Sequence, residues 1–312
     1  MAFREAKNNV FIEGILAEID LKYGSYNSKV TGQPVENIGG LIKVLVEQNI
    51  NGEESKLEVP VYMFSTKLTR KGTINPAYEA IEKVMNEFVS IAACGSKEQA
   101  DKVRISNAKI KMNEFVGQNG QVVSQPRVQG NFVSKAFGEF KPKAEFDLEF
   151  MVSKILPATD NDGVELDPKR LNVEVIVPQY TAEGDSAMNV DVVKLIATNP
   201  KVIDSLEQYW EAGSCYKGGG RLNFSSRTET IVEEVGFGEP VERQRTINTQ
   251  ELIITRGSEA PLEGDFAWEL DDIKAGMAKR TQKLEDMKSG KTSTAKQAPA
   301  QNTSKGSQDL GF

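Results

Sequence analysis

The sequence predicts a mainly β protein made of two consecutive small β-barrels, each interrupted by one short helix. Two stretches carry this prediction, Asn75–Phe88 and Asn199–Trp210. In each, Asn followed by Pro fits a helix N-cap and first helical position, and apolar residues then recur at helical spacing. On both sides of each stretch, apolar and polar residues alternate with a period of two, as in half-buried strands. The same order of elements is therefore expected twice.

In the first half, the segments that read as strands are Asn9–Ile19, Leu41–Glu47, Leu57–Phe64, Lys102–Met112 and Val122–Val133. Asn51-Gly52 is a hairpin turn signal between the second and third of them. Loops are expected at Lys22–Lys29 and at the basic segment Lys67–Gly72. The alternation changes phase within the fourth segment, so we expect a β-bulge near Ser106-Asn107.

In the second half, the expected strands are Phe146–Ile155, Leu171–Val177, Met188–Ala197, a long one beginning at Lys217–Phe224, and Val241–Arg256. A turn is expected at Gly236–Gly238. In both halves, five strands with one helix between the third and fourth is the order of an OB-fold, a small Greek-key barrel. Barrel closure pairs both sheet edges, which explains how such short strands are stabilised.

The predicted domains differ in charge. An OB-fold domain over 1–140 and the linker that follows it, Phe137–Pro142, belong to a mildly basic part of the chain, with about +3 for residues 1–143. An acidic OB-fold domain over 144–265 carries about −12, and the remainder about +2, which together give the net −7. A helix is expected over 266–288 and a disordered tail over 289–312, because the tail has almost nothing to bury.

Composition argues against several classes of function. The chain has no histidine, which removes the commonest general base and metal ligand, so we expect no enzyme. The two cysteines, Cys94 and Cys215, are expected to be free, buried thiols rather than an interdomain disulfide. No apolar run has the length of a membrane span, and the N-terminus shows no export signal. A cytoplasmic location without membrane contact is therefore expected.

Three polar or glycine-rich motifs are interpreted as structural. The acids of Asp160–Asp167 lack the Gly and Glu positions of a calcium loop, and an ordinary hairpin loop is expected. Gly218–Gly220 lacks the ending of a phosphate-binding loop and opens no helix. Asp271-Asp272 fits a helix start. No cofactor or metal is expected.

The first domain carries a nucleic-acid signal, because single-strand binding needs cations along the phosphates and aromatic faces for the bases. The cationic candidates are Lys22, Lys29, Lys43, Lys67, Arg70, Lys71, Arg104, Lys109, Lys111 and Arg127. The stacking candidates are Tyr23, Tyr26, Tyr62, Phe64, Phe115 and Phe132. Each lysine alone is equally consistent with a solvated surface and each aromatic with a core position. Convergence on one face of the barrel would favour binding.

The second domain is less suited to bind DNA phosphates, since its strands carry the acidic residues Asp147, Glu149, Glu174 and Asp191. A local basic patch remains open on its last two strands, at Arg221, Arg227, Arg243, Arg245 and Arg256. This domain is expected to extend the binding site or to serve protein contacts and self-association.

On these residues, the chain resembles the single-stranded DNA-binding proteins, in particular those of bacteriophages. The segment Asn9–Leu16 is similar to their first strand, and the layout of barrel, linker and short acidic-apolar terminus is similar as well. The resemblance implies that the C-terminal tip recruits replication or recombination proteins through Asp309, Leu310 and Phe312. The chain departs from the family in having one Asp instead of an acidic run, Gly311 instead of Pro, and two barrels.

The resulting hypothesis is a protein that coats single-stranded DNA during replication or recombination, in the bacterial host cytoplasm if it is phage-encoded. The alternative is a virion structural or assembly protein whose tandem β-barrels are interaction domains. Preference for single-stranded over duplex DNA, and a strong dependence on salt, distinguish the first hypothesis from the second.

Overall fold

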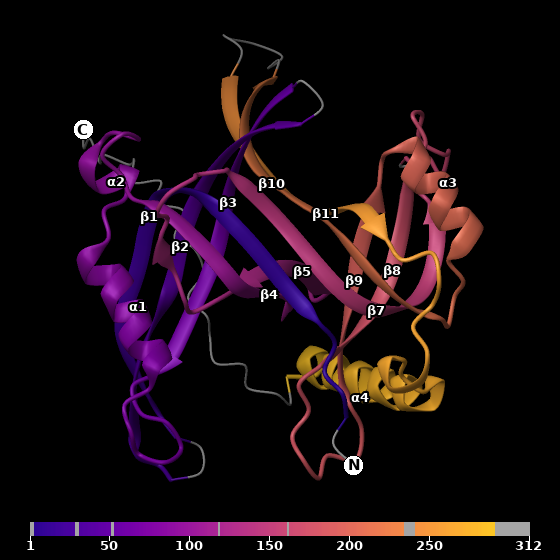
Figure 1. The fold of residues 1–312 in the computed structure, drawn as a ribbon, viewed down its shortest axis with the longest axis horizontal. Helices are drawn as coiled ribbons and strands as arrows, with labels where there is room; N and C mark the ends of the chain where they lie inside the picture. The colour runs from indigo at the N-terminus through magenta and orange to yellow at the C-terminus, as the bar shows by residue number, and fades with distance from the viewer. Residues whose placement is uncertain are drawn as a thin grey trace, which may run out of the picture.

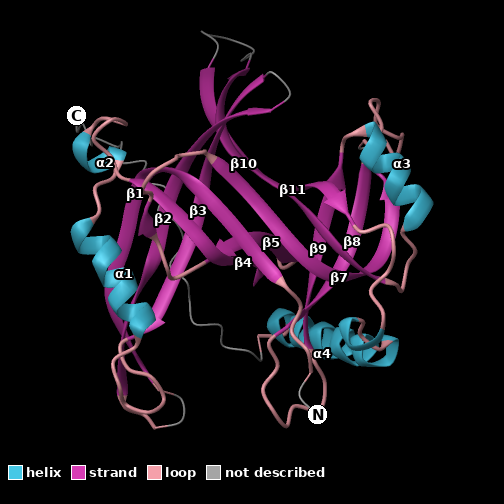
Figure 2. Cartoon of the chain, in the orientation of Figure 1, coloured by secondary structure: helices cyan, strands magenta, loops and turns pink. Residues whose placement is uncertain are grey.

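The computed structural model describes residues 3–28, 31–50, 53–117, 119–160, 162–233 and 241–290. For residues 50, 53, 226–233 and 241–248 it describes the backbone alone. Within these residues, eleven strands form one sheet, and helices cover parts of it (Figures 1 and 2). The chain is mainly β, as the sequence predicts. The two turn signals, at Asn51-Gly52 and Gly236–Gly238, lie outside the described residues, as does the tail from 291 onward.

The first half of the chain closes into a barrel. Its elements are β1 (Asn8–Asn27), β2 (Pro34–Ile50), β3 (Glu53–Thr66), α1 (Pro76–Glu87), α2 (Ile91–Cys94), β4 (Lys102–Val116) and β5 (Val122–Gln129). β1 pairs with β2, β2 with β3, β3 with β5 in parallel, β5 with β4, and β4 with β1 again. This is the closed pairing of an OB-like barrel.

The second half repeats the pairing order. Its elements are β7 (Lys143–Pro157), β8 (Leu171–Gln179), β9 (Asn189–Ala197), α3 (Pro200–Tyr209), β10 (Cys215–Glu233) and β11 (Val241–Gly257). The ladder runs β7–β8–β9–β11–β10 and returns to β7, again with one parallel pair, β9–β11. The predicted fold class is therefore confirmed, including the helix between the third and fourth strands.

Alternation of side chains along the strands builds the two interiors. Leu57, Val59, Val61 and Met63 are all buried on one face of β3, as their spacing predicts. The predicted bulge is present in β4. Val10 of β1 pairs with Ala108 and Ile12 with Ile105, so β4 carries one extra residue around Ser106-Asn107.

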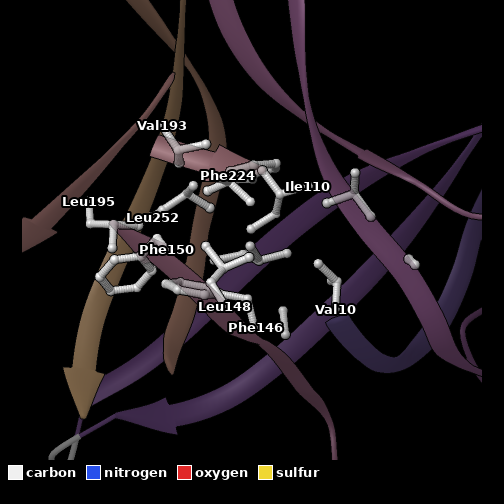
Figure 3. Close-up of a cluster of buried hydrophobic side chains, with 14 of the residues drawn as sticks. Val10, Ile110, Phe146, Leu148, Phe150, Val193, Leu195, Phe224 and Leu252 are labelled. Atoms are coloured by element: carbon white, nitrogen blue, oxygen red, sulfur yellow. The ribbon is translucent and has the colours of Figure 1, made fainter. Parts of the chain in front are cut away.

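The two barrels are joined more closely than a linker would require. β1 and β7 pair antiparallel from Asn8–Leu148 to Glu13–Lys143, with Val10 opposite Phe146. Both barrels contribute to one continuous hydrophobic cluster, and Figure 3 shows Val10 and Ile110 of the first beside Phe146 and Leu148 of the second. The short strand β6 (Ser134–Lys135), paired with β4, begins the connection between them.

Both short helices begin as predicted. The Asn75 Oδ1 atom accepts from the Ala77 N–H at 3.1 Å, and Asn199 Oδ1 accepts from Lys201 N–H at 3.0 Å. Each cap satisfies an N–H that the first helical turn leaves without a backbone partner, and Pro follows each cap as the first helical residue.

The C-terminal helix contacts both barrels. After the 3₁₀ turn η1 (Gly264–Phe266), α4 (Leu270–Lys288) packs Gly276 against Met188 and Val190, where an added Cβ would lie 2.9 Å from Met188 Cγ. One turn further along, Arg280 forms an ion pair with the buried carboxylate of Glu114 in β4. None of the helices in the described part of the chain is both long and apolar enough to cross a membrane.

Some expectations from sequence were wrong or incomplete. Most of the expected loop Lys22–Lys29 is strand, because β1 continues to Asn27 and pairs with β2 as far as Pro34. The last strand of the first barrel ends at Gln129 rather than Val133. Cys94 and Cys215 are free, as predicted, but Cys94 is only half-buried.

Candidate nucleic-acid interface

One surface of the first barrel gathers several of the predicted residues. Lys43 lies between the buried Ile42 and Val44, so its side chain is on the outside of the barrel, and Tyr62, Phe64 and Arg127 alternate with buried neighbours in the same way. The register sets Leu41 beside Tyr62, Gly39 beside Phe64, and Lys22 beside Gly39. We call this surface the outer face; it is carried by Lys22, Gly39, Leu41, Lys43, Tyr62, Phe64 and Arg127. Its residues come from β1, β2, β3 and β5, whose arrangement Figure 1 shows.

The outer face presents two aromatic rings. Phe64 is 47% exposed, and Tyr62 is half-buried. The Arg127 guanidinium carbon lies 5.5 Å from the centre of the Tyr62 ring, a cation–π contact. The exposed ring of Phe64 thus has room for a nucleobase, while Tyr62 presents an aromatic surface next to a cation.

The lysines of the outer face are paired with carboxylates of β1, across strands for Lys43 and within the strand for Lys22. Lys43 Nζ lies 2.6 Å from Glu18, and Lys22 Nζ lies 2.9 Å from Asp20. The hydrogen bond to Glu18 raises the pKa of Lys43, so this cation stays charged. Exposed ion pairs of this kind contribute little to stability, so a phosphate can replace the carboxylate at small cost.

A second basic cluster lies at the end of β3. Lys67, Arg70 and Lys71 lie in the loop before α1, and Lys67 Nζ is 2.5 Å from Glu36 of β2. The ion pair with Glu36 raises the pKa of Lys67. Because Lys67 follows Phe64 by three residues along the chain, this loop continues the outer face at one end.

The two tyrosines of the first strand lie near this end. Tyr26 is 48% exposed. Tyr23 is 55% exposed, yet its hydroxyl donates to Glu82 of α1 at 2.9 Å, and its ring centre lies 6.5 Å from that of Tyr78. Tyr23 is therefore held toward the helix, whereas Tyr26 is available to solvent.

Of four further predicted residues, the three cations have polar partners. Arg104 bonds both oxygens of the buried Glu13, with its Nη2 atom 2.8 Å from Oε1. Lys109 pairs with Glu5 at 2.7 Å, and Lys111 donates to Gln179 of the second barrel. Burial lowers the pKa of Lys111. Phe115 is 40% exposed, far along the β4–β5 hairpin. Their roles in binding stay predictions.

Sequence reasoning missed two residues of this surface, Gly39 and Asn131. Gly39 allows the ring of Phe64 to lie across it, and the Asn131 amide bonds the backbone of Phe64. A glycine within a strand signals a close approach of another group, which is the cue that would have identified Gly39. Asn131 follows the last strand and has no periodic signal.

The basic patch expected on the second barrel is only partly described. Arg256 Nη2 lies 2.7 Å from Asp147, and both line a hollow of about 240 Å³ together with Lys7, Lys217 and Glu149. Carboxylates inside the hollow offset its cations. The side chains of Arg227, Arg243 and Arg245 lie outside the described residues, as do Asp309, Leu310 and Phe312.

Among the described residues, no three Cys, Asp or Glu side chains come close enough together to hold a metal ion. In the loop after β7, Asp160 Oδ1 accepts from the backbone N–H groups of Asp162 and Val164, each at 2.9 Å. This carboxylate thus stabilises a turn.

Comparisons with known proteins match one family model and several solved structures. A family model described as YorF matches residues 7–290. The wild-type single-stranded DNA binding protein from Thermus aquaticus has a TM-score of 0.47 and 10% identity over 84% of this chain and 96% of that one. A deletion variant of the same protein has a TM-score of 0.45 and 12% identity over 83% and 97%. No curated protein sequence matches. Because both TM-scores are low, the fold assignment rests on the strand pairing.

Proposed function

The chain belongs to the YorF family, and we propose that it binds single-stranded DNA on the outer face of its first barrel. The observation that carries the proposal is the placement of Tyr62 and Phe64 beside Lys22, Lys43 and Arg127 on one exposed strand face. In OB-folds, the surface of the second and third strands is the one that binds oligonucleotides.

The chemistry of this face favours single strands without regard to sequence. An unpaired base has a free aromatic face, and stacking on Phe64 or Tyr62 is available to every base. Phosphates would exchange with Glu18 and Asp20 as partners of Lys43 and Lys22. In a duplex the bases are stacked on one another, so no base face is accessible to these rings.

A non-enzymatic protein that coats single strands in this way would act in replication or recombination, in the cytoplasm of the cell where the DNA is copied. We propose that its C-terminal tip, with Asp309, Leu310 and Phe312, recruits protein partners. An acid next to two apolar residues at a free carboxylate fits a basic pocket with an apolar floor.

The test is a titration of oligo-dT and of duplex DNA of equal length at two salt concentrations. We expect tighter binding of oligo-dT and an affinity that falls with salt, because each phosphate contact releases counterions. Equal affinity for both DNA forms, or no effect of salt, would contradict DNA binding and favour the alternative of an assembly protein.

A second experiment tests the tip. A chain ending at Ser289 should bind oligo-dT at least as well as the full chain, since the outer face is intact. It should lose the replication or recombination proteins that the full chain retains in a pull-down. Retention of those proteins by the shortened chain would contradict the role of the tip.

A further inference from the structure

The backbone of Phe64 is held by a side chain at the point where the parallel β3–β5 pairing stops. That pairing consists of Val61–Val128 and Tyr62–Gln129. Gly130 N–H still donates to Tyr62 O at 3.0 Å. Beyond it, Asn131 substitutes for a strand: its Oδ1 accepts from Phe64 N–H at 3.1 Å and its Nδ2 donates to Phe64 O at 3.0 Å.

The ring of Phe64 rests against a glycine on the other side. A Cβ on Gly39 would lie 2.9 Å from Phe64 Cδ2 and 3.1 Å from Met63 O. Real side chains essentially never approach so closely, so a larger residue at position 39 would displace the ring. The φ of Gly39 is not positive, and this glycine therefore provides space rather than an unusual backbone conformation.

Together, Asn131 and Gly39 restrict Phe64 without covering it. The amide fixes both backbone hydrogen-bonding groups of the residue, and the glycine lets the ring lie close to β2 while 47% of the residue stays exposed. The Asn131 amide accepts one hydrogen bond from the Phe64 backbone and donates one to it, which orients the amide toward that residue. The arrangement pre-organises a flat apolar surface, which reduces the ordering cost of binding.

We infer that Asn131 and Gly39 position Phe64 as the stacking platform for an unpaired nucleobase, independent of base identity. The inference rests on the proposed function and adds which ring takes the base and what holds it. Asn131 and Gly39 are positioning residues: neither is required to touch DNA. Their contribution should therefore appear in base stacking and not in phosphate binding.

The experiment compares two probes, oligo-dT and an abasic oligonucleotide of the same length and charge. The ratio of the two Kd values measures stacking, and the salt dependence of each measures phosphate contacts. Wild type should bind oligo-dT more tightly than the abasic probe. Phe64→Ala should lower this preference by about tenfold, within the range expected for one stacked base.

Asn131→Ala and Gly39→Val should each lower the preference for oligo-dT by roughly fivefold, a part of the Phe64 effect. Binding of the abasic probe and its salt dependence should not change. Gly39→Ala adds only the Cβ that would lie 2.9 Å from Phe64 Cδ2 and should lose less. Asn189→Ala is the matched control, because Asn189 also bonds a backbone carbonyl, that of Tyr180 at 3.0 Å, in the second barrel.

The outcomes separate the inference from the proposed function. If wild type fails to bind either probe, DNA binding itself is wrong. If wild type prefers oligo-dT but Asn131→Ala and Gly39→Val keep that preference, the positioning role is overturned while DNA binding stands. Circular dichroism melting identifies a variant that fails to fold. Gly39→Ala, the mildest change, then provides the decisive ratio of Kd values, and an unchanged ratio overturns the inference.

Discussion

The two barrels have the same strand register but opposite outer faces. In the first, the pairing of β1 with β2 shifts between Leu16 and Glu18, and the next pair is Glu18–Lys43. In the second, the pairing of β7 with β8 shifts between Val152 and Lys154, and the next pair is Lys154–Glu174. The bulges align the two barrels residue by residue, and they show that Lys43 corresponds to Glu174. Both ion pairs are formed, with their signs exchanged.

The same alignment reaches the rest of the outer face. Val61 pairs with Val128 as Leu195 pairs with Leu252, so Tyr62 corresponds to Ile196 and Arg127 to Glu251. The position of Lys111 is taken by Asn223, which donates to Glu251 at 2.7 Å. The second barrel thus has an aliphatic residue where the first has an aromatic ring, and a carboxylate where the first has a guanidinium.

This difference teaches that the core and the outer face of the fold are under separate constraints. Inward residues such as Val61 and Leu195 stay apolar in both barrels because closure depends on them. Outward residues can change from positive to negative charge without loss of the fold, since exposed charges contribute little to stability. The contrast therefore predicts that single-stranded DNA binds mainly to the first barrel.

The largest effect is expected from removing both rings of the outer face. The variant Tyr62→Ala with Phe64→Ala should lower affinity for oligo-dT by roughly 2–6 kcal/mol, because each stacked base contributes roughly 1–3 kcal/mol. Fluorescence anisotropy of labelled oligo-dT at fixed salt measures the loss. Ile196→Ala, at the position that corresponds to Tyr62, is the control and should leave affinity unchanged. An equal loss in that control would mean that both barrels share the site.

A somewhat smaller effect is expected from giving the first barrel the charges of the second. In Lys43→Glu with Arg127→Glu, each reversal replaces an attraction of about 1 kcal/mol with a repulsion of similar size at contact distance in water, before screening by salt. The slope of log Kd against log salt should fall by about 1.4, or about 0.7 for each phosphate that the variant no longer neutralises.

The reciprocal variant, Glu174→Lys with Glu251→Arg, sharpens the same comparison. It should raise affinity for oligo-dT and steepen the salt dependence, since the second barrel then presents cations in the same register. Isothermal titration at two salt concentrations measures both quantities. An unchanged affinity for oligo-dT would mean that cations alone do not make this barrel bind DNA and that aromatic rings are also required.

Local signals in the sequence were sufficient for the core and the helices. Period-two alternation placed Val61 inside and Tyr62 outside, and Asn-Pro located both helix starts. The phase change around Ser106-Asn107 located a bulge, because a bulge is a local event in one strand. For the same reason, the outward direction of Lys43 and Phe64 could be predicted.

Contacts between distant segments were beyond the sequence. Alternation states which face a residue occupies but not what lies opposite that face. Lys111 was correctly expected outside its own barrel, yet that outside is the second barrel, at Gln179. The β1–β7 pairing joins segments about 135 residues apart, and neither strand alone encodes its partner. Asn131 replaces a strand, a role that depends on where β5 ends.

A further prediction concerns a position that carries the same residue, a buried glutamate, in both barrels. Glu13 and Glu149 correspond to each other, are both buried, and lie opposite cations, Arg104 and Lys217. The hydrogen bond from Arg104 lowers the pKa of Glu13. Burial alone would raise the pKa of Glu149, but bonds from Arg4 and the Lys7 N–H outweigh it and lower that pKa too.

Both lowered pKa values contribute stability that is present above the unfolded-state pKa of about 4.5 and is lost as the pH falls through the folded-state values. Glu13→Gln and Glu149→Gln should each lower the free energy of unfolding at pH 7 by about 2 kcal/mol, because charge-assisted hydrogen bonds are removed. Each should also flatten the fall of stability in acid. Urea unfolding at several pH values measures this, with the half-buried Glu145→Gln as control. Unequal effects of the two substitutions would show that the barrels differ at their junction as well.

The smallest effect is expected at the helix caps, where the barrels are again equivalent. Asn75→Ala and Asn199→Ala each remove one acceptor from a first-turn N–H, and each should lower the free energy of unfolding by about 1 kcal/mol. Asn→Ser at either position keeps a capping oxygen and should restore most of the loss. Neither cap carries a side chain of the outer face, so oligo-dT affinity should stay at the wild-type value in both variants. If Asn75→Ala weakened DNA binding while Asn199→Ala did not, the loop with Lys67, Arg70 and Lys71 that leads into α1 would have to be ordered by the cap. The functional difference between the barrels would then extend from the outer face to the helix that begins beside it.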